Sequence, residues 1–271
     1  MELYKAKVKK FKNGKIKMRE YKQKMTVPKN TRGENRASTG KKRKEVGKIK
    51  ARSLARTRTN LTELVENNED VFKSFITLTY KEEIEDIDQA YKDLSNYLKL
   101  CKRNLAKEGK ELYYIAVPEI QNKRAQRTGK YVIHFHIISN AEIGSALIPK
   151  REPKKIAGAD HKGITTIEYY DLKGWPDEKK GHSFALPIQH QGEFELSKYL
   201  LKYLYKDLDD RFYGRQKILH SNNLKVPEFQ YYLEEKEIES IKEKNKSNIT
   251  EVFSMSEHET QNPFIDYIYK N

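Results

Sequence analysis

The stretch YVIHFHIISN, residues 131–140, has the β-branched and aromatic composition of a buried strand, yet it carries two histidines. On an extended chain His134 and His136 project from one face and Phe135 from the other. Two imidazoles on one rigid face form a chelating edge for a metal ion. A short His-x-His match arises by chance as well, so a pair of core or interface histidines explains the stretch equally well on its own.

The segments around this strand predict the fold. Residues 82–107 repeat apolar side chains at spacings of three and four, which indicates an amphipathic helix ended by Gly109. A second helical pattern follows at 194–210, and residues 141–190 read as irregular. Three further segments favour strands: VFKSFITLTY at 71–80, ELYYIAVPEIQ at 111–121 and RFYGRQKI at 211–218. The order strand, helix, hairpin, helix predicts an α+β fold, an antiparallel β-sheet with flanking helices.

Glu119 is the candidate third ligand. A basic, glycine-containing loop joins the strand at 111–121 to the histidine strand, so the two form a hairpin. An antiparallel pairing then places Glu119 roughly opposite His134 or His136. Two imidazoles and a carboxylate suit Mn²⁺ or Mg²⁺ used as a Lewis acid, and Zn²⁺ less well. Pro118 confines its strand to an edge or an irregularity, and His182 is an alternative third ligand.

A second group of candidate residues lies in YLLKYLYK at 199–206. Tyr199 and Tyr203 are neighbours on one helical face, and Lys202 and Lys206 follow each by three positions. A tyrosine nucleophile benefits from a nearby cation, because its phenol has an unperturbed pKa of about 10. The alternative is an aromatic stripe that packs on the sheet. Tyr205 is about 200° round the helix from Tyr203 and is expected to face away.

The positive charge is concentrated at the N-terminus. The net charge is +15 over 271 residues, and residues 1–60 hold 22 Lys and Arg against 4 Asp and Glu. This density predicts an arm, residues 1–70, that contacts phosphates, the alternative being a solvated basic tail. The charged end at 236–271 predicts a surface helix and a flexible tail. A single cysteine, no long apolar run and no secretory pattern predict a soluble cytoplasmic protein.

The order of these motifs resembles one family of proteins. FITLTY, a strand with a glutamate, a His-hydrophobe-His strand and then a doubled Tyr-x-x-Lys helix are similar to the rolling-circle replication initiators of the HUH endonuclease superfamily. The doubled tyrosine looks most like the two-tyrosine branch that contains phage A-protein-type initiators. The resemblance covers about Phe72 to Tyr213, and GHSFALPI and RFYGRQKILHSNNLKVP fit it more loosely.

The resemblance implies an HUH endonuclease domain at 71–235 and a mechanism. A divalent ion on His134, His136 and Glu119 would polarise the scissile phosphate of single-stranded or hairpin origin DNA. Tyr199 or Tyr203 would attack to give a 5′-phosphotyrosine and a free 3′-OH for the host polymerase, with Lys202 and Lys206 near the phosphates. The sequence has no Walker A motif, so a host helicase is the expected partner for unwinding.

Two alternatives stay open at this point. Another HUH nuclease, a transposase or relaxase, shares the histidine pair, but the tyrosine pair and its position after the histidine strand disfavour both. A non-catalytic module that binds single-stranded nucleic acid by charge and stacking accounts for the basic arm and the aromatic strands. It predicts that the histidines and tyrosines can be replaced with little loss of function.

Overall fold

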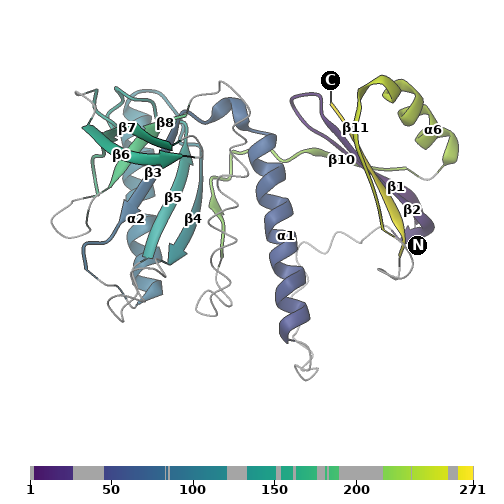
Figure 1. The fold of residues 1–271 in the computed structure, drawn as a ribbon, viewed down its shortest axis with the longest axis horizontal. Coiled ribbons are helices and arrows are strands. Elements are labelled where there is room, and N and C mark those ends of the chain that lie inside the picture. Colours follow the sequence, from purple (N-terminus) through teal and green to yellow (C-terminus); the bar gives the residue numbers. More distant parts are fainter. Residues whose placement is uncertain are drawn as a thin grey trace. The chain divides into compact units, whose positions relative to one another are not determined.

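The computed structural model has two compact units, one made of residues 54–224 and the other of residues 1–53 together with 225–271. Each unit is built on its own antiparallel sheet (Figure 1). The structure describes these parts of the chain: 3–26, 46–82, 84, 86–120, 133–150, 154–160, 163–175, 181, 183–188, 216–232, 234–255 and 262–270.

Residues 54–224 form the unit that contains the histidine strand. Its seven strands run in the order β6-β7-β8-β3-β5-β4-β9, and every pairing is antiparallel. The helices of this part are α1 (Val46–Glu66) and α2 (Ile87–Lys107), with a short 3₁₀ turn at Glu69–Val71. The strands are β3 (Ser74–Thr79), β4 (Tyr114–Ile120), β5 (Ile133–Ser139), β6 (Lys154–Asp160), β7 (Gly163–Asp171), β8 (Phe184–Pro187) and β9 (Leu219–His220).

Strand β5 is apolar because both of its faces are covered. On one face Phe135 and Ile137 join the core formed with α2, whose Leu94 and Leu98 are buried there. On the other face Ile138 packs in a second cluster with Leu61 of α1. All seven residues of β5 are buried, so the expectation of a buried strand is confirmed. The histidines belong to the α1 face, because side chains alternate along the strand.

Helix α2 begins and ends with local signals in the sequence. The Asp86 side chain accepts hydrogen bonds from the backbone N–H groups of Asp88 and Gln89, at 2.9 and 3.1 Å. At the other end Gly109 adopts φ +70°, and the N–H groups of Gly109 and Lys110 donate to the carbonyls of Ala106 and Leu105. This is a Schellman motif, which glycine favours. The helix therefore starts five residues later than the pattern predicted and ends where it predicted.

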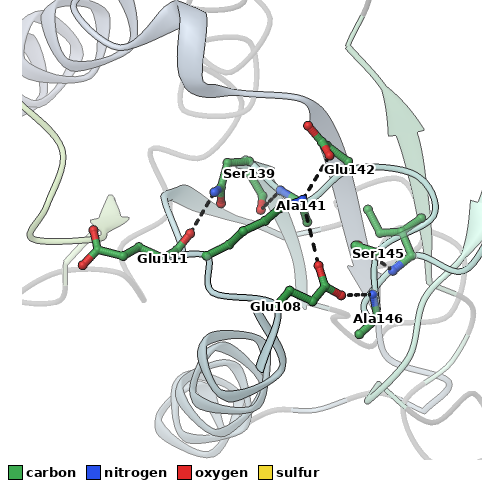
Figure 2. A network of polar contacts seen from close by, with 10 residues as sticks. Glu108, Glu111, Ser139, Ala141, Glu142, Ser145 and Ala146 are labelled. Atoms are coloured by element: carbon green, nitrogen blue, oxygen red, sulfur yellow. Dashed lines mark hydrogen bonds and ion pairs between the residues drawn. The ribbon is translucent and has the colours of Figure 1, made fainter. Parts of the chain in front are cut away.

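A network of backbone and carboxylate contacts fixes the end of the sheet away from the histidines (Figure 2). Glu108, just after α2, accepts a hydrogen bond from the backbone N–H of Ala146 at 2.7 Å. The Ser139 hydroxyl at the end of β5 accepts from the N–H of Ala141 at 3.0 Å. Lys110 bridges to Glu142 at 3.2 Å. These contacts anchor the turn after β5 to the end of α2.

The second unit joins the two ends of the chain in one sheet. Its strand order is β10-β1-β2-β12-β11. Helix α6 (Glu235–Lys244) packs its Ile238 against Ala6, Val8 and Met18, and a 3₁₀ turn follows at Lys246–Asn248. The strands are β1 (Leu3–Lys10), β2 (Ile16–Thr26), β10 (Glu228–Tyr232), β11 (Ile249–Met255) and β12 (Phe264–Tyr269).

The predicted division of the chain therefore needs correction. The expected arm at 1–70 contributes β1 and β2 to the second unit, while α1 from Leu54 onward belongs to the first. The expected tail at 236–271 contributes α6, β11 and β12, and the expected domain end at 235 falls inside the second unit. Pairing between β2 and β12 brings these distant segments together, for example Arg19 beside Asp266. Local pattern cannot reveal such a pairing, because the two strands are far apart in sequence.

The interval 141–190, expected to be irregular, contains β6, β7 and β8. Strand β8 pairs with β3, and β7 pairs with β8, so this interval completes one side of the sheet. Gly158 and Gly163 interrupt the alternating pattern of β6 and β7, which hides them from periodicity. None of the helices in the described segments is long and apolar enough to cross a membrane.

The buried tyrosines of the α2 core predict how this unit responds to pH and mutation. Burial raises the pKa of Tyr97 well above its ordinary value, and burial and the charge of Asp93 also raise the pKa of Tyr80. The Tyr80 hydroxyl donates to Asp93 at 3.0 Å, whereas the Tyr97 hydroxyl has only the Cys101 thiol, a weak partner, beside it. Tyr97→Phe should therefore leave the unfolding free energy unchanged or raise it, and Tyr80→Phe should lower it by about 1 kcal/mol at pH 7.

Urea unfolding followed by Trp175 fluorescence measures this, because the single tryptophan packs on both tyrosine rings. The folded state keeps both phenols protonated, so their contribution is complete below pH about 10 and is lost at higher pH. Tyr97→Phe should gain on wild type at pH 11 relative to pH 7. A Tyr97→Phe chain less stable than Tyr80→Phe at pH 7 contradicts this account.

Candidate active site

Glu119 and the two histidines lie together on one face of the central sheet. The register pairs Glu119 of β4 with His134 of β5, and His136 is two residues further along the same face. The Nε2 atom of His136 and the Oε2 atom of Glu119 are 2.6 Å apart. All three side chains are buried, with 8% of Glu119, 7% of His134 and 5% of His136 exposed. The predicted convergence of strand, hairpin and carboxylate is thus present.

Strand β3 supplies two neighbours that sequence pattern did not single out. Thr77 pairs with His136, and its Oγ1 lies 3.4 Å from His136 Nδ1, while Phe75 stacks on the imidazole at 5.7 Å between ring centroids. A threonine hydroxyl can donate or accept, so it fits either tautomer of His136. With Nε2–H donated to Glu119, the Thr77 hydroxyl donates to Nδ1. The alternation in FITLTY is the signal that could have identified Thr77.

The end of β3 beside this site is held by residues that lie between 175 and 183. The indole Nε1 of Trp175 donates to the carbonyl of Thr79 at 2.9 Å, and the backbone N–H of Thr79 donates to Ser183 Oγ at 3.3 Å. Gly181 has φ +79°, and a Cβ there would lie 2.5 Å from the backbone nitrogen of Lys81. Only glycine meets both conditions. Thr79 itself pairs with His134, so these contacts fix the strand next to the histidines.

Pro118 is accommodated as the sequence indicated. Strand β9 pairs with β4 only at Ile115 and Ala116. Among the described residues no strand flanks β4 on that side at Pro118, so the missing N–H of proline interrupts no ladder there. Glu119 therefore follows directly from the part of β4 that has the character of an edge.

The donor atoms are of the kinds that bind a divalent metal, two imidazoles and one carboxylate. In the structure Glu119 and His136 share a hydrogen bond, and the ring centroids of His134 and His136 are 6.4 Å apart. Within the described segments no three His, Cys, Asp or Glu side chains are already arranged around a common metal position. The chemistry of the donor set fits an ion, and binding would require the Glu119–His136 proton to leave.

Several predicted residues lie outside the described segments. They are the alternative ligand His182 and the tyrosine helix residues Tyr199, Lys202, Tyr203 and Lys206. The predicted helix at 194–210 and the first five residues of the strand predicted at 211–218 lie there as well. Their roles remain predictions.

The fold and site define an α+β protein with a carboxylate–histidine–histidine set on the central strands of an antiparallel sheet. A family model of replication-associated proteins, described as the ORF2 and gene 2 protein type, matches residues 73–208, half of the chain, and the chain belongs to this family. The resemblance to replication initiators is confirmed at this level, and the match extends to no particular branch of them. No curated protein and no solved structure matches the chain.

The packing of Gly181 on the end of β3 generates a stability prediction. Gly181→Ala adds a left-handed-backbone penalty of about 1 kcal/mol and an overpacking cost of about 1–3 kcal/mol, because the new Cβ meets backbone atoms. Gly109→Ala is the matched control, since its φ is +70° and nothing lies within 4 Å of the new Cβ. Urea unfolding monitored at Trp175 should show the larger loss for Gly181→Ala. Equal losses would mean that the contact with Lys81 is relieved at no cost.

Proposed function

We propose that this protein initiates rolling-circle replication by nicking and rejoining single-stranded origin DNA through a tyrosine. The observation that carries the proposal is the placement of Glu119 beside His136 and opposite His134, in a chain of this replication-associated protein family. A buried carboxylate and two imidazoles are costly in a core that apolar residues could fill. Their conjunction on central strands points to chemistry rather than packing.

Glu119, His134 and His136 would hold a divalent ion, Mn²⁺ or Mg²⁺. When bound, the ion supplies Lewis-acid polarisation of the scissile phosphate. The protein's own contribution is orientation. Thr77 can accept the Nδ1 proton of His136 once Nε2 turns to the ion, which is the usual supporting contact of a ligating histidine. The rigid β3–β5–β4 register keeps the three ligands on one face.

Tyr199 and Tyr203 are the proposed nucleophiles. The phenolic oxygen of one attacks the phosphorus of the scissile phosphodiester and loses its proton. The bond from phosphorus to the 3′-oxygen breaks, and that oxygen takes up a proton to become a 3′-OH. The strand is left attached through a 5′-phosphotyrosine, which stores the bond so that a later 3′-OH can reverse the reaction. Lys202 and Lys206 would lower the cost of the phenolate and neutralise the phosphate.

Two tyrosines on one helical face allow two linked cleavages. The second can cut the regenerated origin while the first still holds the displaced strand, which is the logic of the two-tyrosine branch. The new 3′-OH would serve a host DNA polymerase, and a host helicase would unwind the template. With these partners the protein would work in the cytoplasm. A hairpin that exposes the single-stranded nick site is the expected substrate.

A covalent-adduct assay tests the cleavage step. Wild-type protein incubated with a labelled single-stranded origin hairpin and Mn²⁺ or Mg²⁺ should give an adduct that survives a denaturing gel. Tyr199→Phe and Tyr203→Phe should each weaken it and the double variant should abolish it, by at least about 10²-fold, because phenylalanine has no nucleophile. Tyr205→Phe, a neighbour expected to face away, should retain the adduct. An undiminished adduct in the double variant would remove both tyrosines from the mechanism.

Metal binding tests the ligand set separately from cleavage. Calorimetric titration with Mn²⁺ should show weakening of about 10-fold or more for Glu119→Gln, His134→Ala and His136→Ala. His220→Ala is the matched control, because this exposed histidine lies in the same sheet on β9. Affinity should also fall as pH drops through the histidine range, since protonated imidazole cannot ligate. If His220→Ala weakens binding as much as His136→Ala does, the ion is not held by the proposed set.

A further inference from the structure

The five-stranded sheet of the second unit has two unlike faces. On the face covered by α6, the registers align Gln230, Val8, Met18, Tyr267 and Val252 in one row across the sheet. Ile238 of α6 packs on this face. The next row along the strands therefore points to the other side, because side chains alternate. That row holds Tyr231, Lys7, Arg19, Asp266 and Phe253.

Aromatic rings run across this other face from one edge strand to the opposite one. We call it the aromatic face, and its six rings are Phe229, Tyr231, Tyr4, Tyr21, Phe264 and Phe253. Neighbouring rings lie 4.5 to 6.5 Å apart between centroids, so they form a continuous series. Phe253 is 57% exposed and Phe229 43% exposed, which is unusual for large apolar rings.

Cationic side chains lie among these rings. The Lys7 ammonium is 4.7 Å from the Phe229 ring centroid, and the Arg19 guanidinium is 3.8 Å from that of Phe264. The registers pair Lys9 with Phe229 on one side and with Lys17 on the other. Arg19 forms two hydrogen bonds of 2.6 Å to Asp266, so this acidic group is neutralised within the sheet. Lys7, Lys9 and Lys17 then outnumber the one remaining acidic group of these rows, Glu251.

We propose that the aromatic face binds single-stranded DNA, with unpaired bases stacked on its rings and phosphates contacted by Lys7, Lys9 and Lys17. Exposed rings interleaved with cations on an antiparallel sheet are the combination that binds single-stranded nucleic acid. This site lies in a different unit from Glu119 and the histidines. It does not depend on the chemistry proposed for that centre.

The chemistry of the face favours a single strand over a duplex or a protein. Paired bases are already stacked on each other and cannot reach the rings, so a duplex would use only the lysines. An apolar protein surface would use the rings but leave the lysines desolvated without a counter-charge. A single strand satisfies both, because each nucleotide brings one base plane and one phosphate.

Fluorescence anisotropy of the full-length protein with labelled oligothymidine of about 15 nucleotides, in EDTA to prevent cutting, tests the proposal. Phe229→Leu and Phe253→Leu, on the two edge strands, should each weaken binding about tenfold, because leucine keeps the apolar volume but offers no ring to stack on. Val252→Ala is the control on the α6 face of the same strand, and its binding should match wild type. Unchanged binding in both leucine variants overturns the proposal.

The electrostatic part has a charge-matched control. The triple variant Lys7→Gln, Lys9→Gln and Lys17→Gln should reduce the slope of log affinity against log salt by about 2. The triple variant Lys236→Gln, Lys244→Gln and Lys246→Gln removes the same charge from α6 and its following turn and should leave the slope nearly unchanged. Equal effects of the two triples would reduce the site to overall charge and overturn it. A duplex of equal length that binds as tightly as the single strand, or a preference for RNA, also overturns it.

Photocross-linking of the unmodified protein covers the case in which a variant fails to fold. Oligonucleotides carrying iododeoxyuridine should cross-link to peptides that contain Tyr21, Tyr231 or Phe264. Cross-links confined to residues 54–224 overturn the proposal. Adduct formation on the origin hairpin is a separate readout: its absence would count against the nuclease centre and leave the aromatic face standing.

Discussion

The pairing of β4 with β5 is the constraint on which the candidate active site depends. One register sets Glu119 opposite His134 and brings its carboxylate within 2.6 Å of His136. A slip of one residue would turn every side chain of β4 to the other face and send the carboxylate toward α2. The apolar residues that hold the register, such as Ile115 and Ile138 against α1, therefore also define the site.

The second constraint is the anchoring of β3. Its backbone is bound at Thr79 by Trp175 and Ser183, and Gly181 packs closely on the residues that follow it, all from a segment about a hundred residues away along the chain. This arrangement makes Thr77 available to the Nδ1 atom of His136. A ligating histidine must hold its ring in one orientation, and a hydroxyl on a fixed strand behind it is one way to achieve this. The segment GHSFALPI thus has a structural task near the site.

The second unit shows how composition can mislead. The basic N-terminal segment reads as an arm and the acidic and basic C-terminal segment as a tail, yet each supplies strands to the same sheet. Opposite charges are part of the reason: Arg19 bonds Asp266, Glu20 bonds Lys242, and Lys5 pairs with Glu235. The excess of lysine that is left then lies among aromatic rings. A charge run that looked like a solvated arm becomes part of a surface with a defined chemistry.

Much of the site was contained in the sequence, because its signals are local. The period-two pattern of YVIHFHIISN put both histidines on one face, the hairpin loop put Glu119 alongside, and the capping residues of α2 set its ends. Strand partners that are distant in sequence were not predictable: β8 beside β3, β2 beside β12, and Thr77 beside His136. Alternation tells which side chains share a face of one strand. Which strands become neighbours is decided only when the whole chain buries its apolar faces together, and that step belongs to the tertiary structure.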